Sequence, residues 1–236
     1  MTAEDPGALT VLPVRGLPEI DRGARLGRMI AERFPLADGD VLVVTQKIVS
    51  KAEGRVVAVD SDDRAAKVAL AESEAVRVLR RRGDLVVTET RHGFVCANSG
   101  VDLSNVAEGY AVLLPLDPDR SARRIRDELR GLGREVGVIV SDTFGRTWRR
   151  GVTDVAIGCA GIAAVVDLRG QRDGLGRELV ATEICLVDEL ASAAELVMGK
   201  SSGVPVAVVR GVDRAFLRES SVAGEVVRHF GEDLFR

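Results

Sequence analysis

The sequence has few of the residues that disulfide frameworks and histidine metal centres need. Its 236 residues include three cysteines, Cys96, Cys159 and Cys185, and two histidines, His92 and His229. The cysteines are far apart, odd in number and set among apolar residues, so we expect reduced core residues of a cytoplasmic protein. Two histidines exclude a multi-histidine centre, so any metal must be held by oxygen, which favours Mg²⁺ or Mn²⁺.

Long apolar runs and an excess of one charge are also absent. No run approaches the roughly 18 residues of a membrane span, and the N-terminus lacks a basic-then-apolar signal pattern, so we expect no membrane partner. A net charge of -3 gives no overall attraction to nucleic acid. Apolar content of 46% with 29% charged residues is typical of a soluble globular protein with ample core.

Apolar runs and helical spacing predict an α+β protein. We expect strands at residues 10–14, 41–44, 85–87, 94–96, 110–114, 136–140, 163–168 and 204–209. We expect helices from Asp21 to Phe34, over 64–82, from Asp119 or Ser121 to Gly131, and from Asp188 to Met198. The elements alternate irregularly without a linker, which favours two intimately packed subdomains within one domain, residues 1–236.

The most informative stretch is residues 136–162. An apolar run stops at Ser141-Asp142-Thr143, and a Gly-containing loop with Arg146, Arg149 and Arg150 follows. A strand that delivers an acidic and a hydroxyl residue to its carboxyl end, followed by arginines, is what a metal-assisted phosphate site needs. A strand followed by a solvated basic turn explains the same pattern.

Two other polar segments follow expected strands. Residues 45–51 contain two lysines with hydroxyl and amide side chains, which suits a phosphate-contacting turn or, equally, an ordinary surface turn. In residues 97–105, Asp102 and Asn105 could converge on one ion or one base, although Asx-turns explain the same composition without function.

The Gly199-Lys200-Ser201 sequence is not a Walker A loop. The position five residues before Gly199 is Ala194, and a helix precedes the loop instead of following it. The segment could still present backbone amides and Lys200 to a phosphate.

Five segments, in this order, closely resemble the coenzyme F(420)-0 gamma-glutamyl ligase family over nearly the whole chain. They are residues 17–20 (LPEI), 44–54 (VTQKIVSKAEG), 97–105 (ANSGVDLSN), 141–146 (SDTFGR) and 188–199 (DELASAAELVMG). Members of that family add L-glutamate to the carboxylate of a deazaflavin phosphodiester, using GTP and a divalent metal and releasing GDP and phosphate. The resemblance therefore implies a mixed-sheet α+β ligase fold and an intertwined homodimer.

The resemblance also assigns roles to residues. The nucleotide would contact Leu17, Pro18, Glu19, Ile20, Gln46, Lys51, Asn105 and the loop Val197, Met198, Gly199, Lys200, Ser201, Ser202, Gly203 and Val204. Asp102 and Asp142 would share one Mg²⁺ or Mn²⁺ ion, and Thr143 with a backbone oxygen of Gly199 would hold a second. A monovalent cation such as K⁺ is a further expected cofactor. The Gly-Lys-Ser-Ser of the loop departs from the more acidic stretch expected there.

The implied chemistry makes an amide from an unactivated carboxylate. GTP would form an acyl phosphate that the glutamate amine attacks, with Asp102, Asp142, Lys51 and Arg146 as the catalytic residues. Charge alone makes the arginines near 146–150 candidates for holding the acidic deazaflavin tail or the incoming glutamate. A metal-dependent nucleotide hydrolase and a non-catalytic GTP-binding module are the competing hypotheses. The number of glutamates added and a following flavin reductase domain are left open.

Overall fold

A mixed five-stranded sheet forms the centre of the protein in the computed structural model, which describes residues 7–60 and 63–233. Its strand order is β1 (Thr10–Pro13), β12 (Val206–Arg210), β2 (Val41–Thr45), β8 (Gly137–Arg146) and β9 (Arg149–Ala160). Only β2 and β8 are parallel, and the other neighbouring pairs are antiparallel. The expected α+β class with a mixed sheet is confirmed.

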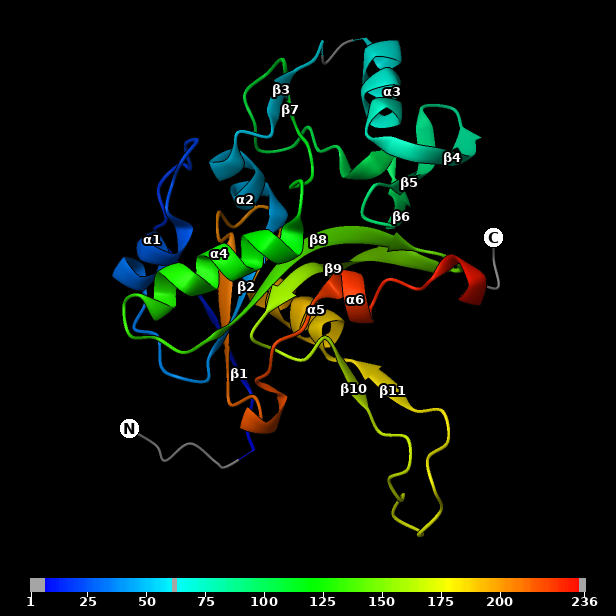
Figure 1. The fold of residues 1–236 in the computed structure, drawn as a ribbon. Coiled ribbons are helices and arrows are strands. Elements are labelled where there is room, and N and C mark those ends of the chain that lie inside the picture. Colours follow the sequence, from blue (N-terminus) through cyan, green and yellow to red (C-terminus); the bar gives the residue numbers. More distant parts are fainter. Residues whose placement is uncertain (1–6, 61–62, 234–236) are drawn as a thin grey trace.

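Helices cover both faces of this sheet (Figure 1). One face packs against α1 (Leu26–Arg33), α2 (Gln46–Glu53) and α4 (Pro118–Arg130), and the other against α5 (Leu186–Met198) and α6 (Val222–Glu225). In β2, Leu42 and Val44 belong to the first core, whereas Val41 and Val43 belong to the second. Burial on both faces is why the central strands read as continuous apolar runs.

A smaller unit lies beside the main sheet, at the upper right in Figure 1. It contains α3 (Arg64–Ser73) and the antiparallel strands β4 (Ala75–Arg82), β5 (Leu85–Thr90) and β6 (Val95–Ala97). The pair β3 (Val56–Ala58) and β7 (Tyr110–Val112) lies between this unit and α2. The 3-10 turn η1 (Asn98–Gly100) follows β6.

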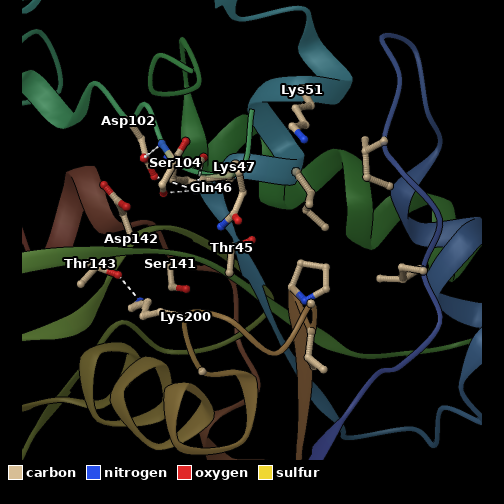
Figure 2. A pocket seen from close by; sticks show the side chains of 18 of the residues that line it. Thr45, Gln46, Lys47, Lys51, Asp102, Ser104, Ser141, Asp142, Thr143 and Lys200 are labelled. Atoms are coloured by element: carbon tan, nitrogen blue, oxygen red, sulfur yellow. Dashed lines mark hydrogen bonds and ion pairs between the residues drawn. The ribbon is translucent and has the colours of Figure 1, made fainter. Parts of the chain in front are cut away.

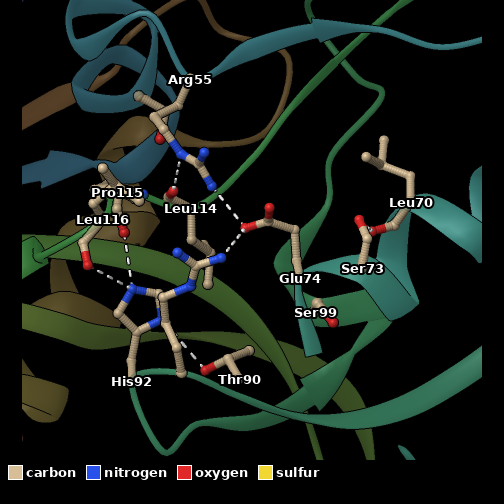
Figure 3. Close-up of polar contacts among 12 residues, drawn as sticks. Arg55, Leu70, Ser73, Glu74, Thr90, His92, Ser99, Leu114, Pro115 and Leu116 are labelled. Carbon is tan, nitrogen blue, oxygen red and sulfur yellow. Dashed lines mark hydrogen bonds and ion pairs between the residues drawn. The ribbon is translucent and has the colours of Figure 1, made fainter. Parts of the chain in front are cut away.

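A polar network joins the smaller unit to the chain around β3 and β7 (Figure 3). The Glu74 carboxylate accepts hydrogen bonds from Arg55 at 2.6 Å and from Arg91 at 3.3 Å. The Nε2 of His92 lies 2.9 Å from the carbonyl oxygen of Pro115. Burial, which disfavours the charged imidazolium, lowers the pKa of His92. This histidine therefore has a packing role.

The remaining elements are short. The pair β10 (Val165–Asp167) and β11 (Glu183–Cys185) forms an arm that projects from the main body in Figure 1. The 3-10 turns η2 (Arg214–Phe216) and η3 (Phe230–Glu232) lie in the last part of the chain. The three cysteines are free thiols, as expected. None of the helices in the described ranges is long and apolar enough to cross a membrane.

The predicted helix over 64–82 is wrong in its second half. The helix ends at Ser73, and β4 follows as a strand paired with β5. Val76, which helical spacing placed inward, is 71% exposed. The stretch AVRVLRRR is held extended by its ladder with β5, and this tertiary contact overrides the local helical pattern.

Other predicted boundaries also need correction. The helix predicted from Asp21 begins at Leu26, and Asp117, not Asp119 or Ser121, caps α4. Asp188 lies inside the first turn of α5 and accepts a hydrogen bond from the Ala156 N–H, so it is not the N-cap. In each case a polar residue that suits a cap has another partner or lies outside the helix.

Candidate functional site

A pocket of about 520 Å³ opens where the parallel pairing of strands β2 and β8 ends (Figure 2). At this edge, Thr45 of β2 pairs in register with Ser141 of β8, and both residues line the pocket. The volume is in the range of small-molecule sites, and this edge of a parallel pair is where ligands usually bind. The lining residues are Leu17, Pro18, Glu19, Ile20, Thr45, Gln46, Lys47, Ile48, Lys51, Asp102, Ser104, Asn105, Ser141, Asp142, Thr143, Asp154, Glu195, Gly199, Lys200, Ser201, Gly203, Val204 and Pro205.

Two segments around the pocket differ from their predicted form. Residues 46–51 are not a turn, because α2 begins directly at Gln46 after β2. Residues 141–146 are not a loop, because β8 continues through them to Arg146, paired with β9. As a result, backbone N–H groups at the start of α2 and the side chains of Asp142 and Thr143 are all held on regular elements.

Five carboxylates line the pocket, those of Glu19, Glu195 and three aspartates. Asp142 and Thr143 lie on β8, Asp154 lies on β9 directly opposite Thr143, and Asp102 lies on the loop after η1. Asp154 is buried and accepts hydrogen bonds from Thr143 Oγ1 at 2.6 Å and Ser141 Oγ at 3.3 Å. Burial, with the charges of Asp102 and Asp154, raises the pKa of Asp142 to about 7.

Two lysines form ion pairs with two of the aspartates, Asp102 and Asp154. Lys47 Nζ lies 2.8 Å from Asp102 Oδ2 and also donates to the Ser104 backbone oxygen and hydroxyl at 2.7 and 2.8 Å. Burial alone would raise the pKa of Asp102, but these hydrogen bonds outweigh it and the pKa is lowered. Lys200 Nζ contacts Thr143 Oγ1 and lies 2.8 Å from Asp154 Oδ1. In Figure 2, the Asp142 side chain lies between Asp102 and Thr143.

A third lysine lies nearer the apolar side of the pocket. Lys51, on the last turn of α2, forms an ion pair with Glu19 of the 17–20 segment. Leu17, Pro18, Ile20 and Ile48 provide apolar surface there. The pocket therefore combines an apolar end with a charged end.

The charged end suits a hard cation. Its donors are the Asp102, Asp142 and Asp154 carboxylates and the Thr143 hydroxyl, all hard oxygen ligands of the kind Mg²⁺ and Mn²⁺ prefer. Burial and the neighbouring charges of Asp102 and Asp154 raise the pKa of Asp142, and a bound cation would act in the opposite direction. Among the described residues, however, no three His, Cys, Asp or Glu side chains already form a metal-binding group. The predicted ligand set Asp102, Asp142, Thr143 and Gly199 stays a prediction.

Most of the predicted site residues line this one pocket. They are Leu17, Pro18, Glu19, Ile20, Gln46, Lys51, Asp102, Asn105, Asp142, Thr143, Gly199, Lys200, Ser201, Gly203 and Val204. Val197, Met198, Ser202 and Arg146 are not among the lining residues. Met198, the last residue of α5, is buried in the core, and Ser202 Oγ donates to its carbonyl oxygen. Arg146 is exposed near the tip of the β8–β9 hairpin and donates to the Arg150 carbonyl oxygen at 3.2 Å.

Two charged lining residues were missed at the level of sequence. Asp154 is a lone acidic residue just before the apolar residues 155–157. Knowledge of the β8–β9 pairing would have placed it opposite Thr143 and so in the site. Glu195 lies on α5 and reaches Lys200 at 3.3 Å. Its helical position gave no sign of a pocket, because exposed glutamates are common on helices.

Comparison with known proteins gives consistent matches. The family model described as F420-0:Gamma-glutamyl ligase matches residues 16–211. The protein named Coenzyme F420:L-glutamate ligase from Methanopyrus kandleri is 42% identical over 253 residues, covering 98% of this chain and 100% of the relative. Proteins of the same name from Methanothermobacter thermautotrophicus and Methanocaldococcus jannaschii are each 40% identical. These alignments cover 97% and 89% of this chain, and 99% and 90% of the relatives.

Proposed function

The chain belongs to the F420-0:gamma-glutamyl ligase family, and we propose that it joins L-glutamate to the carboxylate of coenzyme F420-0 with cleavage of GTP to GDP and phosphate. The observation that carries this proposal is the pocket itself. It combines five carboxylates, three lysines and the start of a helix at one edge of the sheet. A polyphosphate with a bound cation has the charge pattern that this arrangement complements.

The start of α2 and two of the lysines would hold the phosphates. The free N–H groups of the first turn of α2 and the positive end of its dipole attract anions, and no acidic residue occupies that turn. Lys47 at that end and Lys51 one turn later add positive charge. The apolar residues of the 17–20 segment would face the less polar part of the nucleotide.

The residues fit a divalent cation at the charged end, with Asp102, Asp142, Thr143 and the backbone oxygen of Gly199 as the expected ligands. When bound, the cation neutralises phosphate charge. The protein groups would fix the position of the cation and of the phosphate bound to it. Asp142 and Thr143 lie on strand β8, and Lys47 holds Asp102 beside Ser104. Positioning of this kind accounts for much of phosphoryl-transfer catalysis.

The proposed reaction has two steps. An oxygen of the F420-0 carboxylate attacks the γ-phosphorus of GTP, the bond to the β-phosphate oxygen breaks, and GDP leaves. The glutamate amine then attacks the acyl carbon and an amide bond forms. The carbon–oxygen bond to the phosphoryl group breaks, and phosphate leaves with its electron pair and takes up the proton that the amine loses. Lys51, which lines the pocket, would supply positive charge to stabilise the developing phosphate oxygens.

The test measures GDP release from GTP with Mn²⁺, with and without L-glutamate and F420-0, and checks product masses. We expect release to require both substrates and the products to gain glutamate-sized masses. Asp142→Asn is expected to lower the rate by about 100-fold or more, because it removes a charged ligand of the cation that would neutralise the reacting phosphates. Asp127→Asn, on an exposed part of α4, is the matched control.

Three outcomes separate the hypotheses. Release without glutamate or F420-0 would indicate a nucleotide hydrolase, and GTP binding without release would indicate a regulatory module. Full activity of the Asp142→Asn variant would contradict the role of this carboxylate.

We also propose a homodimer, which sedimentation tests. A monovalent cation such as K⁺ is a further proposed cofactor, which exchange of KCl for choline chloride tests. A cytoplasmic location is part of the same proposal, and fractionation of cells tests it.

A further inference from the structure

One cation of the protein already lies among the metal-type ligands of the pocket. Lys200 Nζ contacts Thr143 Oγ1, lies 2.8 Å from Asp154 Oδ1 and lies 3.3 Å from Glu195 Oε1. These are a hydroxyl and two carboxylate oxygens from three different elements, β8, β9 and α5. The same types of oxygen are the usual ligands of Mg²⁺ and Mn²⁺.

Lys200 is the only charged side chain in the described part of the chain that forms an ion pair with Asp154. The Asp154 side chain is 1% exposed, so its carboxylate needs a compensating cation at close range. Its other side-chain partners, Ser141 and Thr143, are neutral hydroxyls. Whatever replaces Lys200 at this position must therefore carry positive charge.

The exposure and loop position of Lys200 would allow its ammonium group to leave Asp154. Its side chain is 54% exposed and lies on a loop between Gly199 (φ 60°) and Gly203 (φ 68°). Lys47, by contrast, is 17% exposed, lies on α2 and has three acceptors within 2.8 Å. The pocket thus holds one fixed lysine beside Asp102 and one exposed, loop-borne lysine beside Asp154.

We propose that Lys200 is a tethered counter-ion that competes with a divalent cation for Thr143, Asp154 and Glu195. The cation enters as the ammonium group leaves, and the freed lysine then pairs with an anionic oxygen of the phosphate ligand. Lys200 therefore sets the cation affinity of the empty pocket and links cation entry to phosphate entry. This inference rests on the proposed function only in taking the pocket to bind a divalent cation and a phosphate.

The test measures Mn²⁺ binding to the purified protein without nucleotide or other substrates, by calorimetry or by the paramagnetic resonance signal of free Mn²⁺. The variants are Lys200→Met, Lys200→Gln and the control Lys67→Met, which makes the same charge change on α3 outside the pocket. If Lys200 occupies the position about nine-tenths of the time, removing it tightens Mn²⁺ binding about tenfold. Lys200→Gln guards against misfolding, because its amide can still donate to Asp154.

A thermal readout separates competition from a structural role. Without metal, Lys200→Met is expected to melt below the wild type, because Asp154 has lost its cation. Saturating Mn²⁺ should raise its melting temperature more than that of the wild type or Lys67→Met. A lysine that only supports the fold predicts equal Mn²⁺ shifts.

The outcomes are distinct from those of the ligase assay. Tighter Mn²⁺ binding by both Lys200 variants and unchanged binding by Lys67→Met would support the inference. Equal or weaker binding by the Lys200 variants, or no Mn²⁺ binding by any of the proteins, would overturn it. Because no substrate is present, failure here leaves glutamate-dependent GDP release to decide the proposed function separately.

Discussion

The charge of Asp142 is expected to lower the stability of the metal-free protein, although the proposed cation site needs it. Its side chain is half-buried near two other aspartates and forms no ion pair in residues 7–60 and 63–233. Burial is the largest cause that raises the pKa of this group from 3.8 to about 7. Replacing it by asparagine keeps the shape and removes the charge. We therefore expect Asp142→Asn to stabilise the metal-free protein at alkaline pH.

The sign follows from proton linkage. Because the folded pKa lies above the unfolded one, folded Asp142 keeps its proton between about pH 4 and pH 7 while the unfolded chain has lost it. Stability therefore falls as the pH rises through this window. Each pH unit between the two pKa values is worth about 1.36 kcal/mol, so the full cost is about 4 kcal/mol and the part between pH 5 and pH 8 is about 3 kcal/mol.

The assay is urea unfolding at pH 5 and pH 8 in the presence of a chelator, for the wild type, Asp142→Asn and the control Asp127→Asn. Relative to the wild type, Asp142→Asn should gain about 3 kcal/mol between the two pH values, because other titrating groups cancel in the difference. Saturating Mn²⁺ at pH 8 should then stabilise the wild type more than the variant. The same difference at both pH values would refute this account of Asp142.

Three further predictions concern packing. Gly158→Ala should cost about 3 kcal/mol in thermal unfolding, because its Cβ would overlap the Pro118 carbonyl group at the start of α4. Glu74→Gln should cost about 2 kcal/mol, because the Arg55 guanidinium would lose its charged acceptor, and amide exchange in β5 should quicken. The Cys96 thiol should be unreactive towards thiol reagents at pH 8 until the protein unfolds, because burial raises its pKa to about 12.

Matched variants control these measurements. Gly145→Ala lies on the neighbouring strand, where an added Cβ would meet nothing within 4 Å, and it should cost little. Glu32→Gln, on the exposed side of α1, makes the same chemical change as Glu74→Gln without a network around it. Equal losses for the paired variants would contradict the packing argument. Reaction of the Cys96 thiol in the native state at the rate of a free thiol would contradict its assigned burial.

The central sheet was predictable because its chemistry is local. Strands β2, β8 and β12 are covered on both faces, so their apolar runs stand out without any knowledge of partners. The acids of the site were also predictable where they follow such a run, as Asp142 does. Their position just after the apolar part of a strand can be read directly from the sequence.

The rest depends on pairing that the sequence does not display. Residues 141–146 look like a loop, yet β9 holds them extended, and β5 does the same for β4. Asp154 joins the site only because the hairpin register sets it opposite Thr143. Conversely, Arg146 follows the motif closely in sequence but lies past the pocket, because an extended strand carries it about 3.3 Å further with each residue.

The ion pairs of the pocket join segments that are distant in sequence. Lys47 on α2 meets Asp102, Lys51 on α2 meets Glu19, and Lys200 meets Asp154. A cation bound at the aspartates competes with a lysine, and a phosphate bound at a lysine competes with a carboxylate. Either ligand alone therefore leaves one member of a pair uncompensated, whereas a cation and a polyphosphate together satisfy both. Since such coupling is reciprocal, each ligand is expected to tighten the binding of the other.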